Sequence, residues 1–114
     1  MSRNYLKNID FAVPQDFAEL VSYQPGQVVS KTLAQNSAVS LTLFAFAKGE
    51  EISSHESKGD AMVVVLDGEG QITIGSEQFI VKAGESIVMP ANTSHAVFAK
   101  EAFKMFLVVV FPQE

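Results

Sequence analysis

Residues 62–99 read MVVVLDGEGQITIGSEQFIVKAGESIVMPANTSHAVFA, in which short apolar segments alternate with turn residues. Five of these segments are rich in the β-branched and aromatic side chains that are typical of strands. The turn signals between them are Asp67-Gly68, Gly75-Ser76, Ala83-Gly84 and Pro90-Ala-Asn92. This spacing has no room for helical crossovers between parallel strands, so it predicts an all-β sandwich or barrel.

The same pattern continues on both sides of this stretch. Further strands are expected at Val28–Leu33, Val39–Ala47 and Phe103–Phe111. Residues 14–21 are expected to form one or two helical turns, because their apolar side chains share a face at helical spacing. A chain of 114 residues is expected to form one domain. We divide residues 1–114 into an N-terminal arm with the first strands (1–37) and a barrel (38–111).

The composition excludes several classes of protein. Hydrophobic residues make up 47% and charged residues 18%, so the chain is too apolar to be disordered. It has no cysteine, which excludes disulfides, thiolate metal sites and cysteine nucleophiles. The net charge is −5 and the basic residues are scattered, so nucleic acid is not expected as a partner.

No membrane partner is expected either. Uncharged apolar runs such as Met62–Leu66 are far shorter than the ~20 residues of a membrane span. The first residues also lack the apolar stretch of a secretory signal. We therefore expect a cytoplasmic protein.

The segment Phe103–Phe111 is apolar on both faces except for Lys104. A strand buried on both sides in so small a protein needs something to cover its outer face. A second copy of the chain would do so, which predicts a homodimer. The alternative is that the N-terminal segment folds back over the strand.

The chain has two histidines, His55 and His95. Five residues separate Gly49 from His55, and Gly68 closes the same stretch. Five residues also separate Gly84 from Pro90, and four more lead to His95.

These two spacings resemble the two motifs of the cupin family. The family's first motif is Gly, five residues, His-x-His, three or four residues, Glu, six residues and Gly. Its second motif is Gly, five residues, Pro-x-Gly, two residues, His, three residues and Asn. The resemblance covers about residues 39–111 and implies a double-stranded β-helix, which is a jelly-roll-like barrel.

The departures from these motifs concern the metal ligands. Ser57 stands where the family has its second His, and Ala61 (or Met62) stands where it has Glu. In the second motif Asn92 replaces Gly and Ala99 replaces Asn. The resemblance therefore leaves His55 and His95 as metal ligands out of the family's four. Two imidazoles leave most of the metal's coordination shell to water, so binding is expected to be weak.

Asp60 lies one residue from the position of the family's Glu. A shift of the strand register by one residue would turn Asp60 inward and give a triad of His55, Asp60 and His95. The alternative is that Asp60 is a turn residue whose carboxylate accepts hydrogen bonds from nearby backbone N–H groups.

Strand alternation predicts which side chains share a pocket with the histidines. The expected lining is His55, Ser57, Val63, Val65, His95 and Val97. Phe44 or Phe46, Met89, and Met105 or Phe106 are expected to extend it. The alternative is that these apolar side chains are simply core.

Three functions remain open from the sequence, and no catalytic residue is assigned. The first is a barrel that binds a small anionic or hydroxylated molecule without a complete metal site. The second is a metal-dependent cupin enzyme (an oxygenase, isomerase, lyase or sugar-processing enzyme) that uses Fe, Mn, Ni, Cu or Zn. The third is a structural protein whose barrel is filled by side chains. Small residues such as Ala61 and Ala99 beside the histidines favour a cavity, and so the first function.

Overall fold

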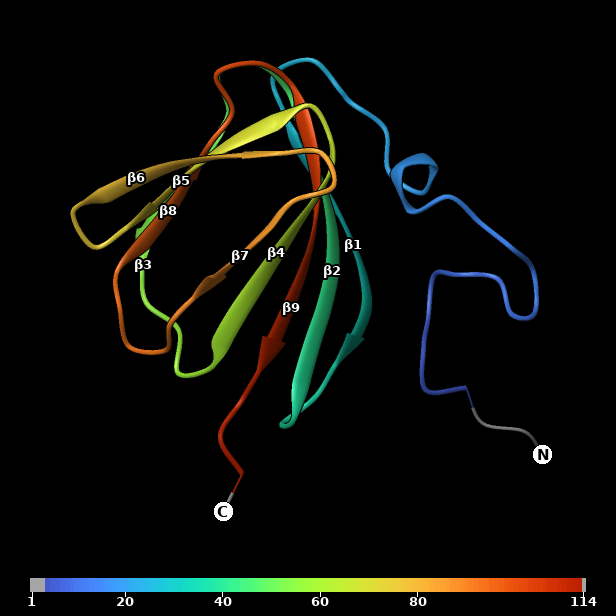
Figure 1. Cartoon of the computed structure of the whole chain (residues 1–114). Helices are drawn as coiled ribbons and strands as arrows, with labels where there is room; N and C mark the ends of the chain where they lie inside the picture. The colour runs from blue at the N-terminus through green and yellow to red at the C-terminus, as the bar shows by residue number, and fades with distance from the viewer. Residues whose placement is uncertain (1–3, 114) are drawn as a thin grey trace.

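The computed structural model describes residues 4–113, which form two antiparallel sheets packed face to face (Figure 1). The five-stranded sheet has the order β1 (Val28–Gln35), β2 (Val39–Phe46), β9 (Phe103–Val110), β4 (Asp60–Asp67), β7 (Ser86–Met89). The four-stranded sheet has the order β3 (Glu51–His55), β8 (His95–Phe98), β5 (Glu69–Ile74), β6 (Glu77–Lys82). The predicted all-β jelly-roll-like barrel is confirmed.

Each predicted strand segment forms a strand, and one further strand, β3, was not predicted. Its sequence, Glu-Ile-Ser-Ser-His, lacks a run of apolar side chains because it lies at a sheet edge and is mostly exposed. Ahead of the strands, a single 3-10 turn, η1 (Phe17–Glu19), replaces the expected one or two helical turns.

The main core lies between the two sheets. Its largest buried side chains include Phe46 and Phe103, whose rings stack with centroids 4.8 Å apart. Gly70 is required beside this pair, since a Cβ there would lie 2.5 Å from a ring atom of Phe103. Backbone and aromatic ring thus pack closely where β5 passes β9.

A second, smaller core covers part of the outer face of the five-stranded sheet. The Phe17 ring in η1 lies 5.0 Å from the Phe106 ring on β9. Lys104, the charged residue of that strand, donates a hydrogen bond to the Ala18 carbonyl, and its ammonium lies 5.0 Å from the centre of the Tyr23 ring. The N-terminal segment therefore supplies some of the cover that the apolar strand needs, as the alternative from the sequence proposed.

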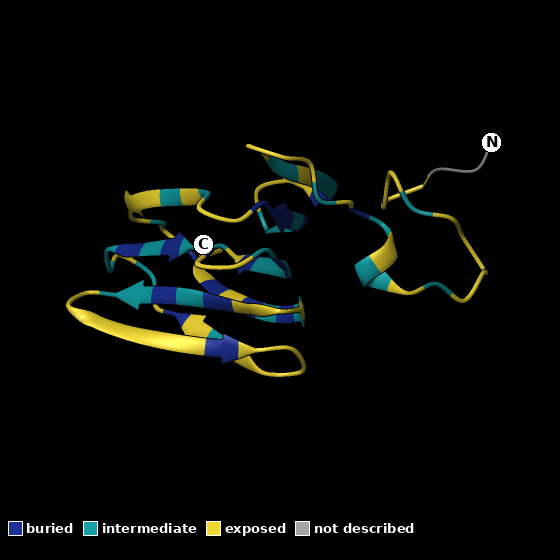
Figure 2. Ribbon diagram, turned by 90° about the horizontal axis from the view of Figure 1, so that it is seen from above, coloured by how far each residue is buried: buried dark blue, intermediate teal, exposed yellow. Residues whose placement is uncertain are grey.

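Within the N-terminal region, we reserve the name arm for residues 4–16. Apart from Ile9, which packs against the second core, the arm runs outside this cover. The arm is held to β1 by a hydrogen bond from the Lys7 N–H to the Leu33 carbonyl (2.8 Å) and one from the Asn8 side chain to the Thr32 carbonyl (2.8 Å). Figures 1 and 2 show it looping away from the barrel, with most of its length exposed. Within residues 4–113, no helix has the length and apolar character needed to span a membrane.

Candidate functional site

The pairing of β3 with β8 brings the two histidines together. His55 and His95 are register partners, and the register between β3 and β8 shifts between Ile52 and His55. The two Nε2 atoms lie 3.1 Å apart, and the rings meet edge to face with centroids 4.3 Å apart. His55 is exposed and His95 is buried, so the pair reaches from the surface into the barrel.

When both rings are neutral, the hydrogen bonds around the pair determine which nitrogen of each ring carries the proton. The Nδ1 atom of His55 lies 3.0 Å from the Ser53 carbonyl, which only accepts, so this Nδ1 carries the proton. The Nε2 atom of His55 is then an acceptor, and the proton between the rings belongs to Nε2 of His95. This leaves Nδ1 of His95 as a buried acceptor with no partner among the described residues.

Protonation of His95 is disfavoured. Burial lowers the pKa of His95 below its ordinary 6.5, and the neighbouring His55 lowers it further, whereas the Thr93 carbonyl acts in the opposite direction. The buried ring therefore stays neutral and keeps a lone pair at neutral pH.

The pair lies at a cavity of about 340 Å³ between the sheets. Most of its wall is apolar, and its polar groups are the two imidazoles, Ser40, Ser57 and the carboxylate of Glu56. The Ser57 hydroxyl accepts a hydrogen bond from the Gly59 N–H (3.1 Å), which leaves its own proton free for another partner. An apolar cavity with a few convergent polar groups is typical of small-molecule sites, and its volume lies at the lower end of their range of about 300–1,000 Å³.

Four of the six predicted pocket residues line this cavity: His55, Ser57, His95 and Val97. Val63 and Val65 do not. They point inward as expected, but β4 carries them past the cavity into the packed core, where they are 0% and 1% exposed.

The structure also decides between the alternative lining residues, Phe44 or Phe46 and Met105 or Phe106. Phe44, Met89 and Met105 line the cavity. Phe46 packs on Phe103 in the core instead, and Phe106 lies on the outer face of the sheet.

Further lining residues were not predicted: Ser40, Ile52, Glu56, Leu107, Val109 and Phe111. The alternation that places Met105 inward also places Leu107 and Val109 inward, so this signal was present in the sequence. Glu56 also lines the cavity, although simple alternation from His55 would turn its side chain away.

Asp60 does not join the two histidines. Its carboxylate accepts a hydrogen bond from the Ala91 N–H (2.9 Å), and it lines a separate shallow hollow on the outside of the barrel. The register of β4 is the one expected from simple alternation, with Ala61 at the cavity and Asp60 outside. Its carboxylate thus binds a backbone N–H, as the alternative proposed, but Asp60 begins β4 rather than lying in a turn, and its partner is distant in sequence.

The two histidines fit a metal ion only in part. Nitrogen ligands about 2.1 Å from one metal ion, at octahedral or tetrahedral angles, are separated by about 3.0–3.4 Å, and the Nε2 atoms here are 3.1 Å apart. However, residues 4–113 contain no group of three or more His, Cys, Asp or Glu side chains arranged to hold a metal. His55 and His95 would supply two ligands, and water or a bound molecule would have to supply the rest.

Asn92, which replaces a glycine of the second motif, has a backbone conformation that suits a tight turn. Asn92 stands at the glycine position of the motif and has φ +61°, a conformation that Asn adopts more readily than most other residues. Its N–H donates to the Ser57 carbonyl (2.7 Å), which joins the loops that carry the two histidines. Asn92 therefore adopts the positive φ that a glycine at this position of the motif would also accept.

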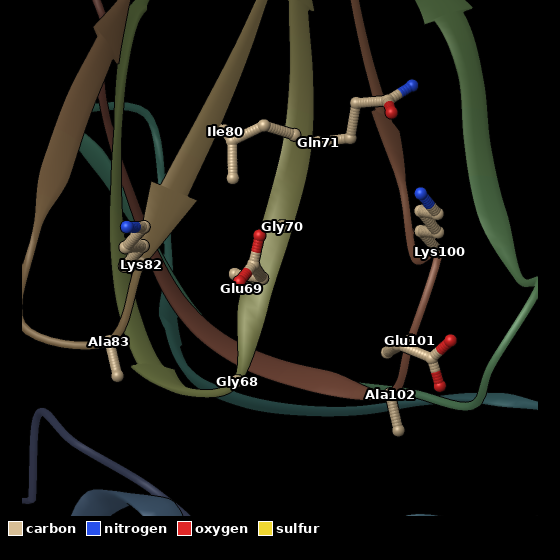
Figure 3. A pocket seen from close by; sticks show the side chains of 10 residues that line it. All are labelled: Gly68, Glu69, Gly70, Gln71, Ile80, Lys82, Ala83, Lys100, Glu101 and Ala102. Atoms are coloured by element: carbon tan, nitrogen blue, oxygen red, sulfur yellow. The ribbon is translucent and has the colours of Figure 1, made fainter.

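A second hollow of about 460 Å³ lies at the other end of the four-stranded sheet (Figure 3). It is lined by Lys82 and Lys100 and also by Glu69 and Glu101, so its charges balance. Figure 3 shows these four side chains apart from one another and not directed at one point, with Glu69 between Lys82 and Lys100. The histidine cavity is therefore the better candidate site.

Comparison with known proteins identifies the fold family. The family described as "Cupin domain" matches residues 42–111. The chain therefore belongs to the cupin family.

Three solved structures illustrate the relationship. A conserved protein of unknown function from Streptococcus pyogenes is 43% identical, with all of both chains covered and a TM-score of 0.97. A cupin superfamily protein from Desulfitobacterium hafniense is 34% identical, over 94% of this chain and 98% of that one, with a TM-score of 0.89. A Cupin 2 conserved barrel domain protein from Leptotrichia buccalis is 49% identical, over 82% of this chain and 45% of that one, with a TM-score of 0.80. No protein with a curated description matches the chain significantly.

Proposed function

We propose that the protein binds a small, neutral, hydroxyl-bearing molecule whose apolar part fills the cavity between the sheets. The observation that carries this proposal is an apolar cavity that ends at the His55–His95 pair and has no cationic side chain in its described lining. The metal-binding carboxylate position of the family is Ala61, which adds space to the cavity rather than charge.

The polar groups of the cavity favour a hydroxyl over a carboxylate. A hydroxyl both donates and accepts, so it can pair with the histidines and with the free proton of Ser57. A carboxylate only accepts, and it would bring a second negative charge into a cavity that already holds Glu56. Of the anionic and hydroxylated ligands expected from the sequence, the cavity therefore favours the hydroxylated class.

Methionine methyl groups provide a direct test. Met89 and Met105 line the cavity, whereas Met62 lies on the outer face of the sheet. We expect benzyl alcohol, at millimolar concentration, to shift the Met89 and Met105 methyl resonances in NMR spectra and to leave Met62 unchanged. Benzoate carries the same ring and is expected to bind more weakly.

Two variants separate binding from stability in this test. Ala61→Leu fills the cavity from its wall and is expected to abolish the methyl shifts. Ile72→Val removes one methylene from an equally buried site that does not line the cavity, and it is expected to keep them. The proposal fails if no alcohol, phenol or polyol in a panel moves Met89 or Met105, or if the carboxylates bind more tightly.

A metal-dependent enzyme is the second candidate, because the Nε2 separation suits two ligands of one metal ion. When bound, such a metal would act as a Lewis acid toward a ligand oxygen. His55 and His95 would hold it, and the apolar wall would exclude bulk water. Elemental analysis of untagged protein purified without chelator, beside His95→Ala, tests this: about one metal per chain, lost in the variant, supports it, and none contradicts it.

A further inference from the structure

Phe111 is a wall that the cavity shares with two hollows outside it. The cavity between the sheets, a hollow of about 340 Å³ beside the β1–β2 turn and a hollow of about 280 Å³ beside the start of β4 are each lined in part by this residue. We call the first of these hollows the outer hollow. Within residues 4–113, no other residue lines both the cavity and either hollow. One aromatic side chain therefore separates the candidate site from the space outside it.

The local sequence explains why the Phe111 ring faces inward. Leu107 and Val109 line the cavity, and alternation along β9 continues to Phe111. Pro112 has no N–H with which to extend the strand, and it favours an extended conformation at the residue before it. Phe111 therefore keeps the inward direction just after β9 ends, and it packs against the main core.

The backbone at Phe111 is held by the turn between β1 and β2 rather than by its own ring. The Phe111 N–H donates to the Ala38 carbonyl (2.9 Å), and the Gln113 side chain donates to the Ser37 carbonyl (2.9 Å). Figure 1 shows the C-terminal segment leaving the barrel at the same end as this turn. Because these bonds do not involve the ring, a smaller side chain at position 111 is expected to leave the backbone in place.

The ring has space on both of its sides. On the inner side, Ala61 on β4 pairs with Val109 on β9, so Phe111, two residues further along, is the diagonal neighbour of Ala61 on the inner face. On the outer side, the outer hollow is mostly apolar, and Lys58 is the one charged residue in its described lining. Loss of the ring would therefore join two apolar spaces of similar volume and lengthen the cavity toward Lys58.

We propose that Phe111 limits the length of the hydroxyl-bearing ligand, an assignment that rests on the proposed function for the class of ligand. With the ring in place, the apolar part of the ligand ends against it. Without the ring, the same part extends into the outer hollow, toward Lys58. The histidine pair is the same in both cases, so Phe111 determines which ligands fit rather than how their hydroxyl group is held.

Straight-chain primary alcohols from butanol to decanol test this limit through the Met89 and Met105 methyl resonances. In the wild type we expect affinity to rise about fourfold with each methylene and then to fall once the alkyl chain reaches the ring. In Phe111→Ala the rise should continue, so that the longest alcohols bind at least tenfold more tightly than to the wild type. Phe106→Ala is the matched control: it removes the same kind of ring from the outer side of β9 and should keep the wild-type limit.

A thiol in the cavity tests the wall without any ligand. The chain has no cysteine, so Ala61→Cys supplies a single thiol at a buried position beside the ring. We expect N-ethylmaleimide to modify this thiol at least tenfold faster when Phe111→Ala is added, and at an unchanged rate when Phe106→Ala is added. Thermal melts verify that each variant is folded.

The two measurements separate this inference from the proposed function. Equal thiol rates with and without the Phe111 ring overturn the wall itself. If alcohols bind but Phe111→Ala keeps the wild-type length limit, Phe111 does not set ligand length and the proposed function stands. If no alcohol binds either protein, the proposed function fails and the length limit fails with it, whereas the thiol rates still decide whether Phe111 closes the cavity.

Discussion

Strand β9 presents one face to the inside of the barrel and one to the outside, and the two faces are almost equally apolar. The inward side chains Phe103, Met105 and Val109 are buried between the sheets, and two of them line or adjoin the histidine cavity. Of the outward side chains, Phe106 and Val108 are half-buried and Val110 is exposed. Apolar character alone therefore does not distinguish a core from a binding cavity or from an interface. The distinction depends on what packs against each face.

Strand β4 shows the same contrast at two adjacent residues. Ala61 lines the cavity with both histidines, and Met62 lies on the outer face of the sheet. A one-residue step thus separates a side chain of the candidate site from one on the outer face of the sheet. Substitutions at paired inward and outward positions test this contrast.

The largest expected difference is in stability. Phe103→Ala removes a fully buried ring that stacks on Phe46, and it is expected to cost about 3–5 kcal/mol of unfolding free energy. Phe106→Ala removes a half-buried ring that touches Phe17, and it is expected to cost about 1–2 kcal/mol. Urea denaturation of both variants beside the wild type measures the difference.

Equal costs for the two variants would contradict the distinction between the faces. They would mean that the outer face is as completely buried in solution as the inner one. Measurement at several protein concentrations shows whether association of two copies is the reason, because its contribution to stability depends on concentration.

The next largest effect concerns the lost metal ligand. Ala61→Glu restores a carboxylate at the cavity beside His55 and His95, and it is expected to tighten Zn²⁺ or Ni²⁺ binding about 10–100-fold, because a third protein ligand completes the usual set. Isothermal titration calorimetry measures the change. Without metal the same variant is expected to be less stable, since a buried carboxylate is unpaired.

Met62→Glu is the matched control for this gain. It adds the same carboxylate one residue further along β4, on the outer side of the sheet, and is expected to leave metal affinity at the wild-type level. A gain in Met62→Glu rather than in Ala61→Glu would mean that the register of β4 in solution differs by one residue. No gain in either would show that the histidine pair is not arranged to accept a metal.

Much of this arrangement could be predicted from the sequence, because it follows from period-two alternation and from glycine-containing turns. The eight predicted strands between Val28 and Phe111 and the inward position of Ala61 follow from those signals. The shared pocket of His55 and His95 was predicted from the spacing of the cupin motifs instead. Strand β3 could not be predicted, since an exposed edge strand needs no apolar pattern.

The sequence also could not predict how far the cavity extends along β4. Val63 and Val65 point inward just as Ala61 does, but whether an inward residue meets empty space or packed neighbours depends on the opposite sheet. The cover on the outer face depends on the N-terminal segment in the same way. Its anchors are contacts distant in sequence, such as Lys104 with Ala18 and Tyr23 with Asp67.

The smallest expected effect is a pH dependence of the unfolding free energy that only the inward-facing His95 produces. Because the pKa of His95 is lowered by burial and by His55, the unfolded chain binds a proton more readily than the folded one. The stability that neutral His95 provides is therefore complete above its ordinary pKa of 6.5 and is lost as pH falls from there toward the folded-state pKa. His95→Gln does not titrate, so its difference in unfolding free energy from the wild type should shrink between about pH 8 and pH 5. Val88→Ala, on the outer face, should differ from the wild type by the same amount at both pH values. A constant difference for His95→Gln would mean that the ring is protonated as easily in the barrel as in water. That result would contradict the lowered pKa of His95.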